Sequence, residues 1–108
     1  MGLVRISAGQ RMNGLVPSLY STNVRYAREP QGVDCWCTAL ETFRAGNGDC
    51  EDLAIWLCSD AILDGDPKAH VVIKPIRPGL AHAMVITHVN GKTFLRDPSR
   101  KLGMRGRG

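Results

Sequence analysis

Residues 48–63 read GDCEDLAIWLCSDAIL and carry the strongest structural signal in the chain. Apolar side chains recur there at the spacing of one continuous helical stripe, formed by Cys50, Leu53, Ala54, Leu57, Cys58 and Ala61. Further apolar residues widen the stripe, which predicts a helix in the middle of a domain. Asp49 precedes it as a candidate N-cap, and Asp52 stands where the second residue of a capping box belongs. The helix is therefore expected to begin at Cys50 and to end at the DGDP segment, residues 64–67.

The chain before this helix divides into two parts. Residues 38–44 contain good helix formers, and Gly46 is placed to end a short helix. Residues 1–34 contain scattered glycines together with Pro17 and Pro30, and only short apolar runs. We expect them to form an irregular arm with at most a short strand or a single helical turn.

The chain after the central helix is typical of a small antiparallel sheet. Three partly alternating, β-branched runs follow one another: HVVIKPI (70–76), HAMVITHV (82–89) and TFLR (93–96). Pro75 favours an edge position for the first of these strands, because proline cannot donate a ladder hydrogen bond. The predicted fold class is α+β, with a central helix packed on a small antiparallel sheet.

At 108 residues the chain is long enough for one domain with one modest core. We divide it into an N-terminal arm (1–34), a motif-bearing core (35–98) and a basic tail (99–108).

The dipeptide Asn90-Gly91 predicts a two-residue hairpin loop between the last two strands. Val89 would then face Lys92, Met84 would oppose Asp97, and His82 would oppose Ser99. In this register His82 and Asp97 lie diagonally on one face of the sheet, close enough for their side chains to meet. That face also carries three apolar residues, so we expect it to pack against the central helix; they are Met84, Ile86 and Leu95.

This arrangement would bring Cys50, His82 and Asp97 together. A thiolate is a strong nucleophile, an imidazole can accept its proton, and a carboxylate can fix the orientation of the imidazole. The first turn of a helix lowers the pKa of a cysteine thiol, because backbone N–H groups and the helix dipole face the sulfur. Three neighbouring carboxylates oppose this effect unless they are engaged in capping or bind a cation; they belong to Asp49, Glu51 and Asp52.

Three segments together resemble the transglutaminase-like cysteine protease superfamily, and most closely its bacterial transglutaminase-like cysteine proteinase branch. They are WCTALETFRAGNGDCEDLA (36–54), HAMV (82–85) and NGKTFLRDP (90–98), which span more than half of the chain. The resemblance implies a papain-like core and action on peptide or amide bonds through an acyl-enzyme. It assigns Cys50 as nucleophile, His82 as base and Asp97 as orienting residue.

The resemblance carries two further implications. Some members of the family bind calcium beside the motif, which marks the same three acids, Asp49, Glu51 and Asp52, as candidate calcium ligands; no other cofactor is expected. The chain is short for the branch, whose members usually have a longer N-terminal portion and are often exported. A short member without a secretory signal is the kind of protein that a phage encodes and installs in its particle.

A zinc site is the rival interpretation of the cysteines. Cys35, Cys37, Cys50 and Cys58 supply four thiols, but a C-x-C pair directs its thiols unfavourably, and Cys58 lies two helical turns beyond Cys50. The N-terminus lacks the apolar run of a secretory signal, so we expect a cytoplasmic or virion location and no disulfides. No apolar run is long enough to span a membrane.

The positive charge is concentrated in the last part of the chain. Residues 92–108 contain six basic residues and one acid, although the whole chain has a net charge of only +4. The tail lacks interleaved aromatic residues, which disfavours nucleic acid as its partner. An acidic surface in a large assembly is the alternative partner.

Two functions therefore remain open. The first is a cysteine-dependent hydrolase or acyltransferase that acts on a polypeptide. The second is a structural or adaptor component of a phage particle or other large assembly, in which the same fold carries an idle site.

Overall fold

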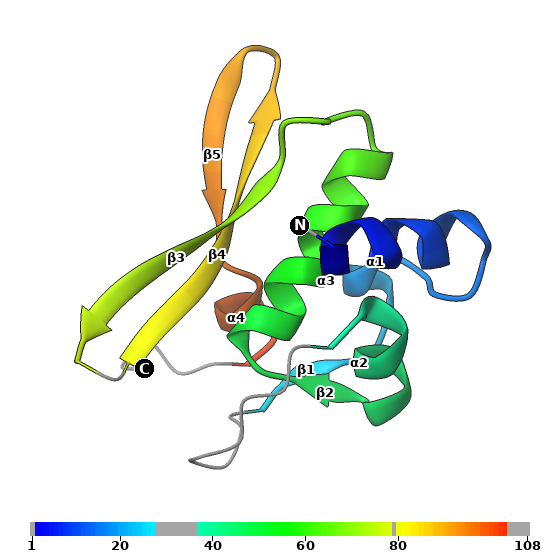
Figure 1. The fold of residues 1–108 in the computed structure, drawn as a ribbon, viewed down its shortest axis with the longest axis horizontal. Coiled ribbons are helices and arrows are strands. Elements are labelled where there is room, and N and C mark those ends of the chain that lie inside the picture. The colour runs from blue at the N-terminus through cyan, green and yellow to red at the C-terminus, as the bar shows by residue number, and fades with distance from the viewer. Residues whose placement is uncertain (1, 28–36, 79, 104–108) are drawn as a thin grey trace.

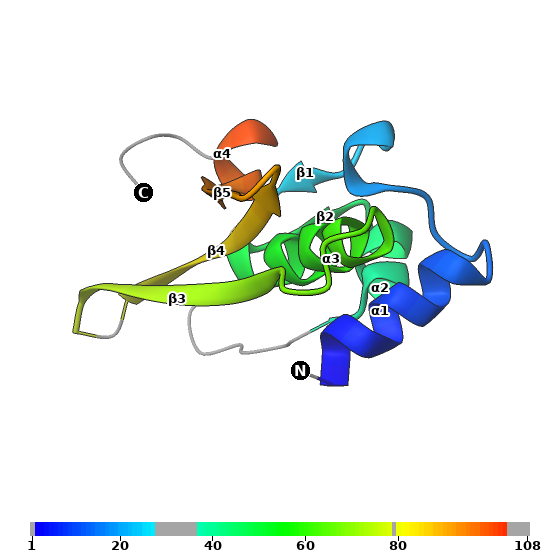
Figure 2. The same cartoon turned by 90° about the horizontal axis from the view of Figure 1, so that it is seen from above.

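Helix α3 (Cys50–Leu63) lies at the centre of the computed structural model, which describes residues 2–27, 37–78 and 80–103. A three-stranded antiparallel sheet packs on one side of α3, and two further helices pack on another side (Figures 1 and 2). The prediction of an α+β fold with a central helix on a small antiparallel sheet is confirmed at this level.

The described elements follow one another along the chain in a simple order. They are α1 (Gly2–Met12), the 3-10 turn η1 (Leu19–Ser21), β1 (Arg25–Tyr26), α2 (Ala39–Ala45), β2 (Asn47–Gly48), α3 (Cys50–Leu63), β3 (His70–Arg77), β4 (Leu80–Val89), β5 (Lys92–Arg96) and α4 (Pro98–Lys101). Cys35, Trp36 and residues 104–108 of the basic tail lie outside the described residues.

The two helices predicted around the GDC motif begin and end as expected. Thr38 caps α2 in a capping box with Glu41, and Gly46 ends this helix in the left-handed conformation with φ 81°. Asp49 caps α3 in a second capping box with Asp52. These ends could be predicted because each depends on side chains within a few residues of the helix terminus.

The prediction of an irregular arm over residues 1–34 is wrong for residues 2–12, which form helix α1. This helix has only a weak apolar face, so its sequence pattern gave little signal. Tertiary contacts stabilise it instead: the Ser7 hydroxyl accepts a hydrogen bond from the Ala39 N–H, and Arg11 forms an ion pair with Asp60. A short strand does follow, because β1 pairs in parallel with β2.

The hairpin between β4 and β5 has the predicted register from Val89–Lys92 to Val85–Arg96. Asn90 and Gly91 both have positive φ, 53° and 79°, as a type I′ turn requires. The predicted pairing of Met84 with Asp97 and of His82 with Ser99 does not occur. Strand β5 ends at Arg96 because Asp97 leaves the sheet as the N-cap of α4.

The face of the sheet that packs on α3 is opposite to the one expected. Ala83 and Val85 are buried in one cluster with Ile55 of α3, whereas Leu95 is 60% exposed. Both faces of β4 carry apolar residues, so alternation along the strand did not distinguish them. Strand β3 is one of the two edge strands of this sheet, as Pro75 predicted.

The core consists of two clusters on different sides of α3. The first joins α3 to α1 and the sheet through Val4, Ala54, Ile55, Cys58, Ala69, Ala83 and Val85. The second joins α3 to η1, α2 and α4 through Val16, Leu19, Val24, Ala39, Leu53, Trp56 and Leu102. Within the described ranges, no helix is both long and apolar enough to cross a membrane.

Candidate functional site

The capping box of α3 fixes the backbone around Cys50. The Asp52 N–H donates to Asp49 Oδ1 at 3.1 Å, and the Asp49 N–H donates to Asp52 Oδ2 at 3.2 Å. Asp52 Oδ1 also accepts a hydrogen bond from the Cys37 N–H, which ties the segment before α2 to the start of α3. Both carboxyl groups are buried, so these bonds hold the first turn rigidly.

Gly48 is needed for the close packing behind this turn. A Cβ atom at Gly48 would lie 2.8 Å from Thr42 Cγ2 and 2.9 Å from Asp52 Cβ. The Gly48 carbonyl also accepts a hydrogen bond from the Ala27 N–H at 2.8 Å. The glycine before the motif therefore lets α2, β1 and α3 approach one another.

The Cys50 sulfur lies against strand β4. The backbone N–H groups of Ala83 and Glu51 lie close enough to the sulfur to lower its pKa. Ala83 directly follows His82, and its N–H is accessible to the sulfur because the ladder with β5 ends at Val85. Contacts between α3 and β4 thus bring the thiol to the residue next to the candidate base.

The pKa of Cys50 is raised, contrary to the lowering expected from its helix position. Burial is the main cause because it disfavours the thiolate, and the charges of Glu51 and Asp49 act in the same direction. The two backbone N–H groups near the sulfur lower the pKa but do not outweigh these effects. At neutral pH, therefore, the resting side chain is a thiol.

His82 and Asp97 are in direct contact, as predicted. His82 Nε2 lies 2.9 Å from Asp97 Oδ2, and the histidine is buried. A carboxylate partner at Nε2 favours the tautomer that carries its proton on Nε2, and in that tautomer Nδ1 is an acceptor. Asp97 Oδ1 in turn accepts from the Arg100 N–H as the N-cap of α4.

The structure brings two of the three predicted residues into direct contact, and the third lies nearby. His82 and Asp97 form a hydrogen-bonded pair. Cys50 packs against the cluster that contains Ala83 and Val85, and the His82 side chain lies on the opposite face of β4 from these two residues. Among the described residues, no hydrogen bond joins the Cys50 thiol to the imidazole of His82.

The acids proposed as calcium ligands are engaged in other contacts. Asp49 and Asp52 accept hydrogen bonds from backbone N–H groups in the capping box. In the part of the chain that the structure describes, no group of three or more His, Cys, Asp or Glu side chains is arranged to hold a metal ion. Cys58 is buried in the core, where its pKa is raised to about 11, mainly by burial.

Asp52 has a pKa raised to about 7 from an ordinary value of 3.8, because burial and then the charge of Asp49 disfavour its ionised form. The folded protein therefore binds this proton more tightly than the unfolded chain does. The contribution of Asp52 to stability is therefore fully present below about pH 4 and is lost as the pH rises to about 7.

The variant Asp52→Asn is expected to flatten this pH dependence, because the amide keeps an acceptor for the Cys37 N–H but carries no titratable proton. The measurement is the free energy of urea unfolding at about pH 5 and about pH 8, with an expected effect of a few kcal/mol at most. Asp64→Asn, at the exposed end of α3, is the control. An unchanged difference between the two pH values in Asp52→Asn would contradict the prediction.

A second histidine–carboxylate pair was missed by the sequence analysis. His88 Nδ1 lies 3.1 Å from Asp66 Oδ1, and the backbone N–H of His88 donates a hydrogen bond to Asp66 Oδ2 at 2.6 Å. The sequence signal was weak, since Asp66 belongs to a turn segment and His88 lies next to the hairpin loop. His82 and His88 point to the same face of β4, but only His82 adjoins the residue that contacts Cys50.

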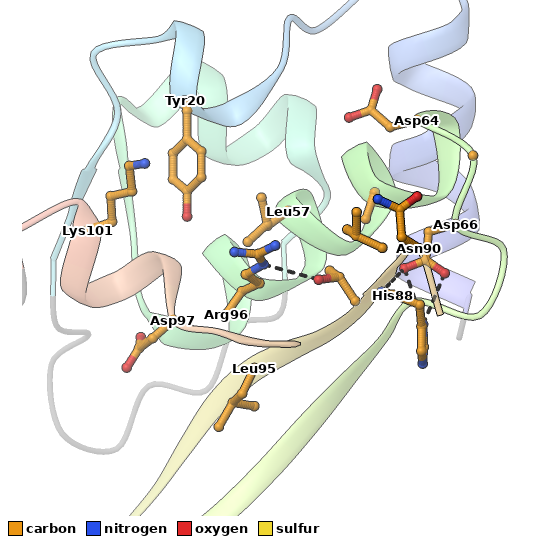
Figure 3. Close-up of a pocket in the computed structure, with 14 residues that line it drawn as sticks. Tyr20, Leu57, Asp64, Asp66, His88, Asn90, Leu95, Arg96, Asp97 and Lys101 are labelled. Carbon is orange, nitrogen blue, oxygen red and sulfur yellow. Dashed lines mark hydrogen bonds and ion pairs between the residues drawn. The ribbon is translucent and has the colours of Figure 1, made fainter. Parts of the chain in front are cut away.

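A cavity of about 600 Å³ lies between the C-terminal half of α3, the β4–β5 hairpin, η1 and α4 (Figure 3). Asp97 lines this cavity, and Cys50 and His82 do not. Its lining side chains come from elements far apart in the sequence, so no local pattern could indicate it.

Comparison of the chain with protein-family models, with curated proteins and with solved structures finds no match.

Proposed function

We propose that the protein is a cysteine-dependent amide or peptide hydrolase, or an acyltransferase, with a core of the papain-like or transglutaminase-like type. Cys50 is the nucleophile, His82 the base and Asp97 the orienting residue. The observation that carries this proposal is the 2.9 Å contact between His82 Nε2 and Asp97 Oδ2, next to Ala83, whose backbone N–H lies near the Cys50 sulfur.

The raised pKa of Cys50 favours proton transfer during the reaction over a preformed ion pair. As the sulfur attacks the substrate carbonyl carbon, the S–H proton passes to His82 Nδ1. The first N–H groups of α3 stabilise the oxyanion. Collapse of the tetrahedral intermediate breaks the C–N bond, and the leaving amine takes the proton from Nδ1. The product of this half-reaction is a thioester on Cys50.

The second half-reaction reverses these roles. Water or an amine attacks the thioester carbonyl and gives a proton to Nδ1, and the sulfur then leaves and recovers that proton. Water yields a carboxylic acid, whereas a lysine amine yields a cross-linked product. Asp97 holds the ring through Nε2–H in both steps, so that Nδ1 remains the atom that exchanges protons.

Acylation with a small activated ester tests the proposal. Purified protein is mixed with p-nitrophenyl acetate near neutral pH, and acetylated peptides are identified by mass spectrometry. We expect acetylation at Cys50, no acetylation there in Cys50→Ala, and none at buried Cys58. Addition of a free amine then separates the two activities, because a transferase would convert it to an acetamide and a hydrolase would release acetate.

The alternative function is a structural or adaptor component of a phage particle or other large assembly. Two observations favour it: the resting Cys50 is a thiol, and within the described chain this thiol has no hydrogen bond to His82. This alternative predicts that Cys50 is acetylated no faster than an ordinary exposed thiol.

A further inference from the structure

The cavity behind Asp97 separates opposite charges at its two ends (Figure 3). Tyr20, Arg96 and Lys101 gather at one end, which Asp97 also lines with a carboxylate that is engaged by His82 and by the Arg100 backbone N–H. Asp64 and Asp66 lie at the other end, near the hairpin loop. The lining also includes the apolar side chains of Leu57, Ala61 and Val89, and Leu57 lies between the two ends in Figure 3. A volume of about 600 Å³ lies within the range of sites that enclose small molecules.

The cationic end has charges without acidic partners. Arg96 Nε donates to the Thr87 hydroxyl at 3.1 Å, and its guanidinium stacks on Phe94. Lys101 Nζ lies 4.4 Å from the ring centroid of Tyr20. Among the described residues, neither cation forms an ion pair with a carboxylate. Such a pair of cations lining a cavity is suited to bind a carboxylate.

The Tyr20 hydroxyl adds a donor at this end. Burial raises the pKa of Tyr20, although the charge of Arg96 acts in the opposite direction. The phenol is therefore neutral at physiological pH and can donate its hydrogen to an anion.

The acidic end lies at the C-terminus of α3. Asp64 is the C-cap of this helix, and its last turn contains no basic residue. The partial negative charge of a helix C-terminus is thus uncompensated there and adds to the carboxylate of Asp64. Asp66 is already paired with His88, so Asp64 is the carboxylate at this end with no ion-pair partner in the described chain. Together these groups favour an ammonium group.

We infer that this cavity binds a short peptide with free termini, with its carboxylate at Arg96 and Lys101 and its ammonium at Asp64. A peptide of a few small residues carries both charges at its ends and an apolar or neutral middle, which matches the order of groups along the cavity. A single free amino acid has the same two charges next to each other and reaches only one end. Asp97 lines the cavity, but binding requires no chemistry at Cys50 and can be measured without acyl transfer.

Trialanine and its blocked forms test the inference by calorimetric titration. Trialanine is expected to bind, and N-acetylation or C-terminal amidation is expected to weaken binding about tenfold each, since each removes a charge-assisted contact. Free alanine is expected to bind more weakly than trialanine. Cys50→Ala protein is expected to bind trialanine as tightly as wild type does, which keeps this result independent of the proposed enzyme activity.

Matched variants locate the site. Lys101→Gln is expected to weaken trialanine binding about tenfold and to have no further effect on the amidated peptide. Asp64→Asn is expected to weaken trialanine binding about tenfold and to have no further effect on the N-acetylated peptide. Lys92→Gln removes a cation from the same hairpin outside the cavity and is expected to change nothing. The inference is overturned if trialanine fails to bind at millimolar concentration, or if the blocked peptides or alanine bind as tightly as trialanine.

Discussion

Replacement of His82 by alanine is expected to slow acetylation of Cys50 by about 10²- to 10⁴-fold, which is the usual contribution of a general base. The reason is the raised pKa of Cys50: a buried thiol at neutral pH needs a base to remove its proton as the sulfur attacks. The measurement is the rate of p-nitrophenol release in the first turnover, together with the acetylated fraction of the Cys50 peptide.

His88→Ala is the matched control for this variant. His88 is also paired with an aspartate and also points to the His82 face of β4, but it lies at the hairpin end of the strand. Its removal is expected to leave the acetylation rate unchanged. Equal rates in wild type and His82→Ala, with both proteins folded by circular dichroism, would exclude His82 as the base.

The role of Asp97 is separable from that of His82. Asp97→Asn keeps an oxygen that can accept the Nε2–H hydrogen bond, whereas Asp97→Ala removes it. We therefore expect the asparagine variant to retain more activity than the alanine variant. A positioning role for Asp97 predicts this order, but a role as the cap of α4 predicts it too, because asparagine is a good N-cap and alanine is a poor one. Equal stability of the two variants in urea unfolding would assign the difference in activity to the positioning of His82.

Replacement of Trp56 by alanine is expected to destabilise the fold by about 3–5 kcal/mol. Trp56 is fully buried in the cluster between α3, η1, α2 and α4. Its indole N–H donates to the Pro17 carbonyl at 3.1 Å, and its ring meets Phe43 edge to face with centroids 6.0 Å apart. The alanine variant loses the buried ring, the hydrogen bond and the aromatic contact together, and leaves a cavity.

Urea unfolding of Trp56→Ala and Trp56→Phe measures these contributions. The phenylalanine variant keeps most of the apolar contact, so its loss of stability is expected to be much smaller than that of the alanine variant. A loss below about 1 kcal/mol in Trp56→Ala would mean that this cluster does not hold α3 to its neighbours.

Local sequence features were enough to place the helix ends and the hairpin around the candidate site. Thr38, Gly46 and Asp49 act on backbone groups within one turn of themselves, and Asn90-Gly91 sets the register of β4 and β5 through its own backbone conformation. The predicted proximity of His82 and Asp97 is confirmed, but Asp97 makes this contact after it has left the sheet as the N-cap of α4 and not through the predicted strand pairing.

The sequence by itself thus determined where α2 and α3 begin and end, how β4 pairs with β5, and that His82 and Asp97 lie close together. Only the tertiary structure decided that Ala83 and Val85 face α3, that residues 2–12 form a helix, and that Cys50 is a thiol with a raised pKa. The physical reason is that the features determined by the sequence depend on hydrogen bonds and turns between near neighbours. The features that the tertiary structure decided depend on which surfaces distant elements bury. At Cys50, burial outweighs the effect of the helix N-terminus on the pKa of the thiol.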